Sequence, residues 1–125
     1  MNSWLPLGPS TGEVVAVLPD QDPGRGGGVF APFFGQPAWT MALLSRLATR
    51  SGAPVFFGFA RRLPRGDGYR LEFLPALAAT TSVELTESAA AVNAAVEVCV
   101  RRVPAQYQWS YKRFKTRPPG EPRWY

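Results

Sequence analysis

The chain has 125 residues, 46% of them hydrophobic, with 13 prolines, 12 glycines and a formal net charge of +5. This length fits one small domain or a piece of a larger one, and the many aromatic residues argue against disorder. The sequence contains no run of 18 apolar residues and no signal-peptide pattern, so it predicts neither a membrane span nor a secretory leader. The single cysteine, Cys99, excludes an internal disulfide, and its apolar helical surroundings indicate a buried side chain rather than a reactive thiol.

The basic residues gather in two stretches, while most acidic residues lie elsewhere. The first stretch, residues 46–70, carries Arg46, Arg50, Arg61, Arg62, Arg65 and Arg70. The second, residues 101–125, carries Arg101, Arg102, Lys112, Arg113, Lys115, Arg117 and Arg123. Such segregation favours an anionic partner, which could be nucleic acid, an anionic membrane surface or an acidic protein. The alternative is a solvated basic face with no partner.

The first half of the chain predicts a lead-in, a strand, a long loop and a helix. Residues 1–12 hold two prolines and two glycines without periodicity, so we expect a loose lead-in. Residues 13–18 are apolar and rich in valine, which is typical of a buried, parallel strand. A long loop with Gly26–Gly28 follows. Apolar residues then recur at helical spacing over 37–50, and Gly52 marks the stop.

The second half predicts a hairpin followed by a long helix. Residues 54–60 are an apolar run, and residues 69–74 alternate; a turn at 64–68 joins them. A helix from about Thr86 to Arg102 carries an apolar face, is capped by Thr86 or a nearby Ser/Thr, and ends before Pro104. The order predicts an α/β fold: a partial mixed sheet of about three strands with covering helices. A tail that interleaves aromatic and basic residues closes the chain.

The loop after residue 18 is the main candidate for a site. Asp20 and Asp22 follow the predicted strand directly, and α/β folds gather ligand sites at that end of their strands. The alternative is an Asx-Pro turn in which both carboxylates bond nearby backbone amides. The aromatic residues beyond the loop are expected to form core, or, as the resemblance set out in the next paragraph implies, to line an acyl channel. These residues are Phe30, Phe33, Phe34 and Trp39.

Two sequence blocks resemble one enzyme family. The first runs Leu-Pro-Asp-Gln-Asp-Pro from residue 18 and continues with Gly-Gly-Val-Phe-Ala-Pro-Phe-Phe-Gly at 27–35, then Ala38 and Thr40. The second is Pro-Ala-Gln-Tyr-Gln-Trp-Ser-Tyr-Lys-Arg-Phe-Lys-Thr-Arg-Pro at 104–118, with Asn93 and Glu97 also in register. Both resemble the lipid A biosynthesis lauroyl/myristoyl acyltransferases of the glycerolipid acyltransferase superfamily. The resemblance covers residues 13–125 and implies the C-terminal part of that acyltransferase domain.

The resemblance implies a function and a set of contacts. The family moves a fatty acyl group from acyl carrier protein to a hydroxyl of a lipid A precursor, at the cytoplasmic face of the inner membrane. It implies that Asp20, Asp22, Arg25, Gly26, Gly27 and Gly28 help to hold the acceptor or its phosphate. It further implies membrane or carrier-protein contact by Arg61, Arg62, Lys112, Arg113, Lys115 and Arg117. No metal, cofactor or nucleic acid is expected.

One departure from the family bears on activity: the chain has no histidine. The superfamily uses a histidine as general base, oriented by an acidic residue about five positions later. In the family this block, an arginine-bearing block and a membrane anchor lie upstream of Asp20. We therefore expect a fragment, from a truncated gene, a late start codon or a partial sequence, that is inactive alone. Two alternatives stay open: a non-catalytic basic module for lipid or nucleic acid, and a degenerate fragment without a stable fold.

Overall fold

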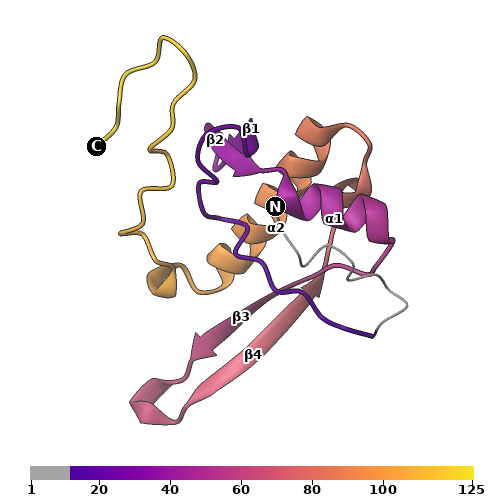
Figure 1. Ribbon diagram of the computed structural model, residues 1–125. Helices are drawn as coiled ribbons and strands as arrows, with labels where there is room; N and C mark the ends of the chain where they lie inside the picture. Colours follow the sequence, from indigo (N-terminus) through magenta and orange to yellow (C-terminus); the bar gives the residue numbers. More distant parts are fainter. Residues whose placement is uncertain (1–11) are drawn as a thin grey trace.

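The computed structural model describes residues 12–125, which form two β-hairpins, two α-helices and a long C-terminal tail (Figure 1). The predicted lead-in, residues 1–12, lies outside the described residues except for Gly12. Within the described residues no helix combines the length and the apolar composition needed to cross a bilayer.

The first hairpin pairs β1 (Gly28–Phe33) with β2 (Gln36–Met41) in antiparallel register. Phe34 and Gly35 form its two-residue turn, and both have positive φ, 49° and 77°. Two successive positive φ values are the geometry of a type I′ turn, which suits the twist of a hairpin. This hairpin was not predicted: residues 37–41 were expected to begin a helix, and the structure shows them in β2 instead.

The two helices differ in length and burial. α1 (Leu43–Ser51) ends at Gly52, whose φ of 66° and N–H bond to the Ala48 carbonyl make the predicted C-terminal stop. α2 (Leu85–Arg102) confirms the predicted long helix and its end before Pro104. The prediction of a Thr86 cap is wrong, because the Ser82 hydroxyl instead accepts from the N–H of Glu84.

The second hairpin pairs β3 (Phe56–Arg62) with β4 (Tyr69–Pro75), as the sequence predicted. It extends away from the helices (Figure 1). Its connection includes a short 3₁₀ turn, Pro64–Gly66, and is closed by a 2.8 Å bond from the Leu63 N–H to the Gly68 carbonyl. The α/β class is confirmed, but the strands form two separate antiparallel pairs rather than one mixed sheet.

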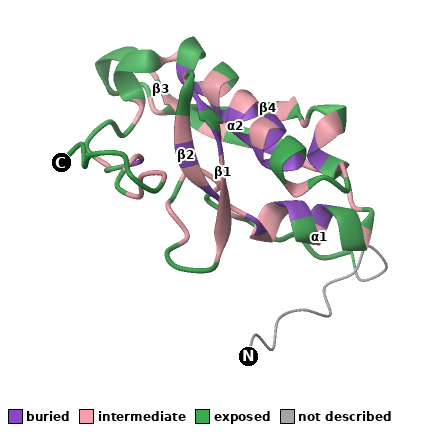
Figure 2. Cartoon of the chain, turned by 90° about the horizontal axis from the view of Figure 1, so that it is seen from above, coloured by how far each residue is buried: buried purple, intermediate pink, exposed green. Residues whose placement is uncertain are grey.

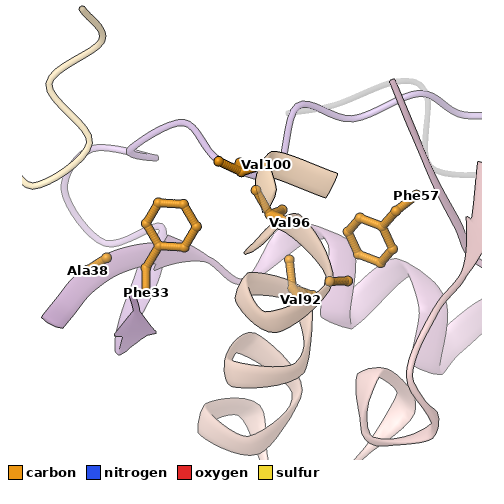
Figure 3. Close-up of a cluster of buried hydrophobic side chains, with 7 residues drawn as sticks. Phe33, Ala38, Phe57, Val92, Val96 and Val100 are labelled. Atoms are coloured by element: carbon orange, nitrogen blue, oxygen red, sulfur yellow. The ribbon is translucent and has the colours of Figure 1, made fainter. Parts of the chain in front are cut away.

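The core lies between α2 and the two hairpins (Figure 3). Its buried residues are Phe33, Ala38, Phe57, Val92, Ala95, Val96 and Val100. α2 therefore has one buried side running its length, which Figure 2 shows as alternating purple bands on that helix. Phe33, only 1% exposed, is the largest fully buried side chain.

The predicted strand over residues 13–18 is wrong for this structure. These residues belong to no strand or helix, and Val14 and Leu18 are 92% and 64% exposed. A β-branched run forms a strand only when a neighbouring strand accepts its hydrogen bonds. Among residues 12–125 no backbone hydrogen bond joins this run to another segment.

Candidate functional site

The loop at residues 19–27 and the C-terminal tail lie against each other, although about 90 residues separate them. The Tyr107 hydroxyl donates to Asp20 Oδ2 at 3.0 Å. The backbone N–H of Asp22 donates to the Tyr111 hydroxyl at 2.7 Å. Trp39, from β2, donates its indole N–H to the Gly24 carbonyl at 2.8 Å. The two blocks that carry the family resemblance thus form one local structure.

An open hollow of about 600 Å³ lies where the loop, β2 and the tail meet. Its lining combines two exposed cations, one carboxylate and an indole. The lining residues are Asp22, Pro23, Gly24, Arg25, Gly26, Trp39, Lys115 and Thr116. Of the residues predicted to hold the acceptor, Asp22, Arg25 and Gly26 line this hollow, and Lys115 joins them from the tail.

Asp22 forms the turn that the sequence allowed, and it also lines the hollow. Its Oδ1 accepts from the Gly24 N–H at 2.9 Å, which is the Asx turn. Its Oδ2 is buried and has no hydrogen-bond partner within the described part of the chain. A buried carboxylate oxygen without a donor is uncommon in folded proteins, so this atom has acceptor capacity that no contact of the described residues uses.

Asp20 does not line the hollow; it lies against Tyr107. Burial of the Tyr107 ring raises the pKa of its hydroxyl, and the nearby Asp20 carboxylate raises it further. The hydroxyl therefore stays protonated at neutral pH and donates to Asp20. The pair fixes the start of the loop against the tail.

The three predicted glycines have different tasks. Gly26 has a positive φ of 73°, which favours glycine. A Cβ on Gly28 would lie 2.5 Å from the Thr40 carbonyl oxygen, so that position must stay small for β1 and β2 to pair. The Gly27 carbonyl accepts from the Ala42 N–H at 3.0 Å. Only Gly26 of the three borders the hollow, and Gly27 and Gly28 serve the hairpin.

The prediction that Arg113 is an exposed cation facing lipid is wrong for this structure. It is 3% exposed, and its guanidinium donates to the Trp39 carbonyl at 2.7 Å and to Thr40 Oγ1 at 3.0 Å. It also donates to Asn93 Oδ1 at 3.3 Å and lies over the Phe33 ring. Burial lowers the pKa of this guanidinium. Its role is to tie the tail to β2 and α2.

Arg117 is likewise turned inward, with only 5% of its side chain exposed. It donates to the Pro37 carbonyl at 2.8 Å and to Glu121 at 2.7 Å, and it lies over the Trp124 ring. The prediction that it faces a membrane or carrier is therefore wrong for this structure.

The remaining predicted cations divide by their surroundings. Arg61 pairs with Glu72 across the β3–β4 hairpin and is partly buried. Arg62 is exposed, near the far end of the same hairpin. Lys112 and Lys115 are exposed on the tail, where each lies 5.7 Å from a tyrosine ring centroid, Tyr125 and Tyr111 respectively.

A buried polar network joins residues that the sequence did not assign. The Asn93 side chain, on α2, donates to Thr40 Oγ1 at 2.8 Å, and the same oxygen also accepts a hydrogen bond from the Arg113 guanidinium. Glu97, one turn further along α2, accepts the backbone N–H of Phe34 at the β1–β2 turn. Polar residues at buried positions of an apolar helix face were the available signal.

The four predicted aromatic residues do not act as one group. Phe33 is core, and it packs edge-on against Phe34 with ring centroids 4.7 Å apart. Phe34 lies under the Arg101 guanidinium. Phe30 packs on Trp39 at 4.8 Å, next to the hollow. The core alternative holds for Phe33, whereas Trp39 is the one that borders the hollow.

Comparison with known proteins agrees with this arrangement. Residues 10–116 match the model of the bacterial lipid A biosynthesis acyltransferase family. The chain is 41% identical over 115 residues to the lipid A biosynthesis lauroyltransferase of Escherichia coli K12, which covers 91% of this chain and 38% of that protein. It is 42% identical over 114 residues to the palmitoleoyltransferase of the same organism, covering 88% and 36%. A lipid A biosynthesis acyltransferase of Haemophilus influenzae is 36% identical over 110 residues.

The chain thus spans well under half the length of the curated relatives that it matches. The match nevertheless takes in the loop, both hairpins, α2 and most of the tail. The chain belongs to the bacterial lipid A biosynthesis acyltransferase family.

Proposed function

We propose that this chain is the C-terminal portion of an acyltransferase that moves a fatty acyl group from acyl carrier protein to a hydroxyl of a lipid A precursor. The observation that carries the proposal is the assembly of the loop and the tail around one hollow. Both segments match the family, and the relatives carry acyl transfer to lipid A in their names.

In this reaction the acceptor hydroxyl oxygen attacks the thioester carbonyl carbon of the donor. A C–O ester bond forms, the C–S bond breaks, and the thiol of the carrier leaves with a proton. A general base takes the hydroxyl proton, and the family resemblance gives that task to a histidine. These 125 residues contain no histidine, so in this proposal they do not supply that base.

The hollow suits the anionic head of the acceptor. Arg25 and Lys115 supply two cations at its rim, and the Thr116 hydroxyl and the Trp39 ring complete a wall that takes a sugar phosphate. Asp22 Oδ2, buried and without a donor in the described residues, is available to accept from a sugar hydroxyl. In this proposal the chain positions the acceptor and does not perform the proton transfer.

Lys112 and Lys115, together with Arg62, are proposed to face the anionic inner-membrane surface or the acidic carrier protein. All three are exposed. Two tail rings, Tyr107 and Phe114, instead pack inward against the buried Phe33. This use of the rings inside the fold favours the lipid or carrier surface over a platform for stacked bases.

The test is a chimera in which residues 13–125 replace the matching segment of the Escherichia coli lauroyltransferase. Purified chimera is given lauroyl-acyl carrier protein and a lipid A precursor, and ester formation is measured. The control is a second chimera in which the catalytic histidine of the lauroyltransferase part is replaced by alanine. Turnover above that of the control supports the proposal. A folded, membrane-associated chimera without turnover contradicts it.

A further inference from the structure

We infer that the outer face of the β3–β4 hairpin is an interaction surface for another layer of polypeptide, namely the part of a lipid A acyltransferase that this chain does not match. The identity of that partner rests on the proposed function. The existence of the surface rests on the hairpin itself.

The outer face of the hairpin is apolar over three successive cross-strand pairs. The register places Phe56 opposite Pro75, Gly58 opposite Phe73, and Ala60 opposite Leu71. The large side chains among them are open to solvent: Phe56 is 63% exposed, Leu71 66% and Phe73 65%. Charged and hydroxyl-bearing side chains enter this face only at its far end, with Arg62 opposite Tyr69.

The shape of this face suits a packed layer. A Cβ on Gly58 would lie 2.7 Å from the Phe73 ring, so the ring lies directly over the glycine backbone. A ring placed over a glycine, beside the small Ala60, gives a flat apolar surface. Isolated exposed apolar residues are ordinary in proteins, but a contiguous patch of this kind marks an interaction site.

The inner face of the same hairpin is already covered. Phe57 is 6% exposed and belongs to the core cluster with Val92 and Val96 of α2. An antiparallel hairpin that is covered on one side alternates apolar and polar residues. Next to the core this hairpin is apolar on both faces, with the pair Phe57 and Leu74 on the inner side, which is the pattern of strands covered on both sides. Further from the core the inner face carries Arg61, Arg70 and Glu72.

The extended segment before the loop would also gain from a polypeptide partner, and not from lipid. Residues 13–18 are rich in valine, and no backbone hydrogen bond joins them to another segment of the described chain. Backbone N–H and C=O groups need hydrogen-bond partners once they are covered, and lipid tails supply none. A strand from a second layer would supply them, and would also cover Val14 and Leu18.

The relatives have enough additional chain to form this layer. The match covers 38% of the Escherichia coli lauroyltransferase, so roughly three fifths of that enzyme lies outside it. We therefore assign the remaining part of the enzyme as the partner that covers the outer face of the hairpin.

The experiment co-expresses the 125-residue chain with the tagged, unmatched part of the Escherichia coli lauroyltransferase and measures how much chain co-purifies. We expect a complex, and we expect the Leu71→Asp/Phe73→Asp variant to reduce it about tenfold or more. The matched control is Val83→Asp, because Val83 is 88% exposed but lies just before α2, away from the hairpin. It should leave the complex intact.

Several results would overturn the inference. One is a soluble tagged part that fails to retain the wild-type chain; another is equal retention of the hairpin variant. A dimer of the chain alone, or its binding to phosphatidylglycerol vesicles, would assign the face to a second copy or to lipid if the same variant abolished it. A gain in complex on deletion of residues 1–11 would assign the face to that segment.

If the tagged part is insoluble, the single-chain chimera decides the matter. There the hairpin variant should lower the melting temperature well below that of Val83→Asp, and equal melting temperatures would overturn the inference. The proposed function is tested separately: it fails if the chimera with the wild-type hairpin shows no acyl transfer.

Discussion

Lys112 and Arg113 are neighbours in the chain, yet burial gives them different tasks. Lys112 is exposed, whereas Arg113 is buried and donates to three acceptors on β2 and α2. Burying a guanidinium is costly unless its donors are bonded. Both terminal nitrogens of Arg113 are bonded, while its Nε has no partner among the described residues, and the acceptors around the guanidinium depend on it in turn.

Replacing Arg113 should therefore affect stability. Arg113→Met removes the donors but keeps much of the apolar stem, leaving the Trp39 carbonyl and Asn93 Oδ1 short of partners. We expect a loss of about 3 kcal/mol in the free energy of unfolding, measured by urea denaturation. Lys112→Met is the control and should change it by less than about 0.5 kcal/mol. Similar losses of unfolding free energy in both variants would show that Arg113 does not hold the tail against β2 and α2.

Asp22 and Asp20 should separate in the chimera. Asp22→Asn keeps an acceptor for the Gly24 N–H but removes the charge at the hollow, so turnover should fall about tenfold or more with little change in melting. Asp20→Asn alters a contact with Tyr107 and should lower melting more than turnover per folded molecule. Steady-state kinetics and thermal unfolding of both variants give the comparison. Unchanged turnover in Asp22→Asn would mean that Asp22 only stabilises the turn.

At the scale of elements, one carboxylate fastens the β3–β4 hairpin to α2. Glu72 accepts from Arg61 on the neighbouring strand and from Arg102 at the end of the helix, the latter at 3.3 Å. The Arg61 hydrogen bond, the largest cause, holds the pKa of Glu72 below its ordinary value of 4.5, and Arg102 adds to this. The Arg61 pair spans 11 residues within the hairpin, and the Arg102 pair joins residues 30 apart in the chain.

The stability supplied by Glu72 should depend on pH. Its folded pKa lies below the unfolded value, so its contribution is present above pH 4.5 and is lost as the pH falls through the folded pKa. Glu72→Gln should thus melt below wild type at neutral pH, and the gap should close in acid. Melting curves across this range test it, with the exposed Glu84→Gln as control. A gap that persists unchanged well below pH 4.5 would exclude the charge as its cause.

Local pattern predicted some elements well and others not at all. The β3–β4 hairpin and α2 were found because alternation and helical spacing are local signals. The β1–β2 hairpin was missed because its turn is Phe34-Gly35, without the Asn or Asp that marks such turns. The run at 13–18 has strand composition, but pairing depends on a partner strand, which composition does not reveal.

The candidate site was predictable in its loop and not in its tail. Asp22 was identified from its place after an apolar run, and Arg25 and Gly26 from the family resemblance; all three line the hollow. Burial of Arg113 and Arg117 depends on how the tail folds back over β2, a contact across more than 70 residues. No sequence window contains that information, so basic residues in the tail were all expected to be exposed.

At the scale of the whole molecule, the chain alone should lack acyltransferase activity. It has no histidine, and loss of a general base costs about 10²–10⁴-fold in rate. Purified chain given lauroyl-acyl carrier protein and a lipid A precursor should form no ester above the buffer rate. The active chimera is the positive control for the assay. Turnover by the unaccompanied chain would refute both the fragment interpretation and the assigned mechanism.

The basic tail should govern association with an anionic surface, mainly through Lys112 and Lys115. Lys112 and Lys115 are exposed, while Arg113 between them is buried and contributes nothing to this contact. Each cation near an anionic leaflet contributes about 1 kcal/mol, so Lys112→Gln/Lys115→Gln in the chimera should weaken binding to phosphatidylglycerol vesicles roughly thirtyfold.

Salt and a matched variant separate this effect from a general loss of charge. The difference should shrink as the ionic strength rises past about 0.15 M, because the Debye length then falls below about 8 Å. Arg46→Gln/Arg50→Gln removes the same charge from exposed positions on α1, away from the tail (Figure 1), and should leave vesicle binding nearly unchanged. Equal weakening by both double variants would mean that net charge, and not the tail surface, draws the protein to the membrane.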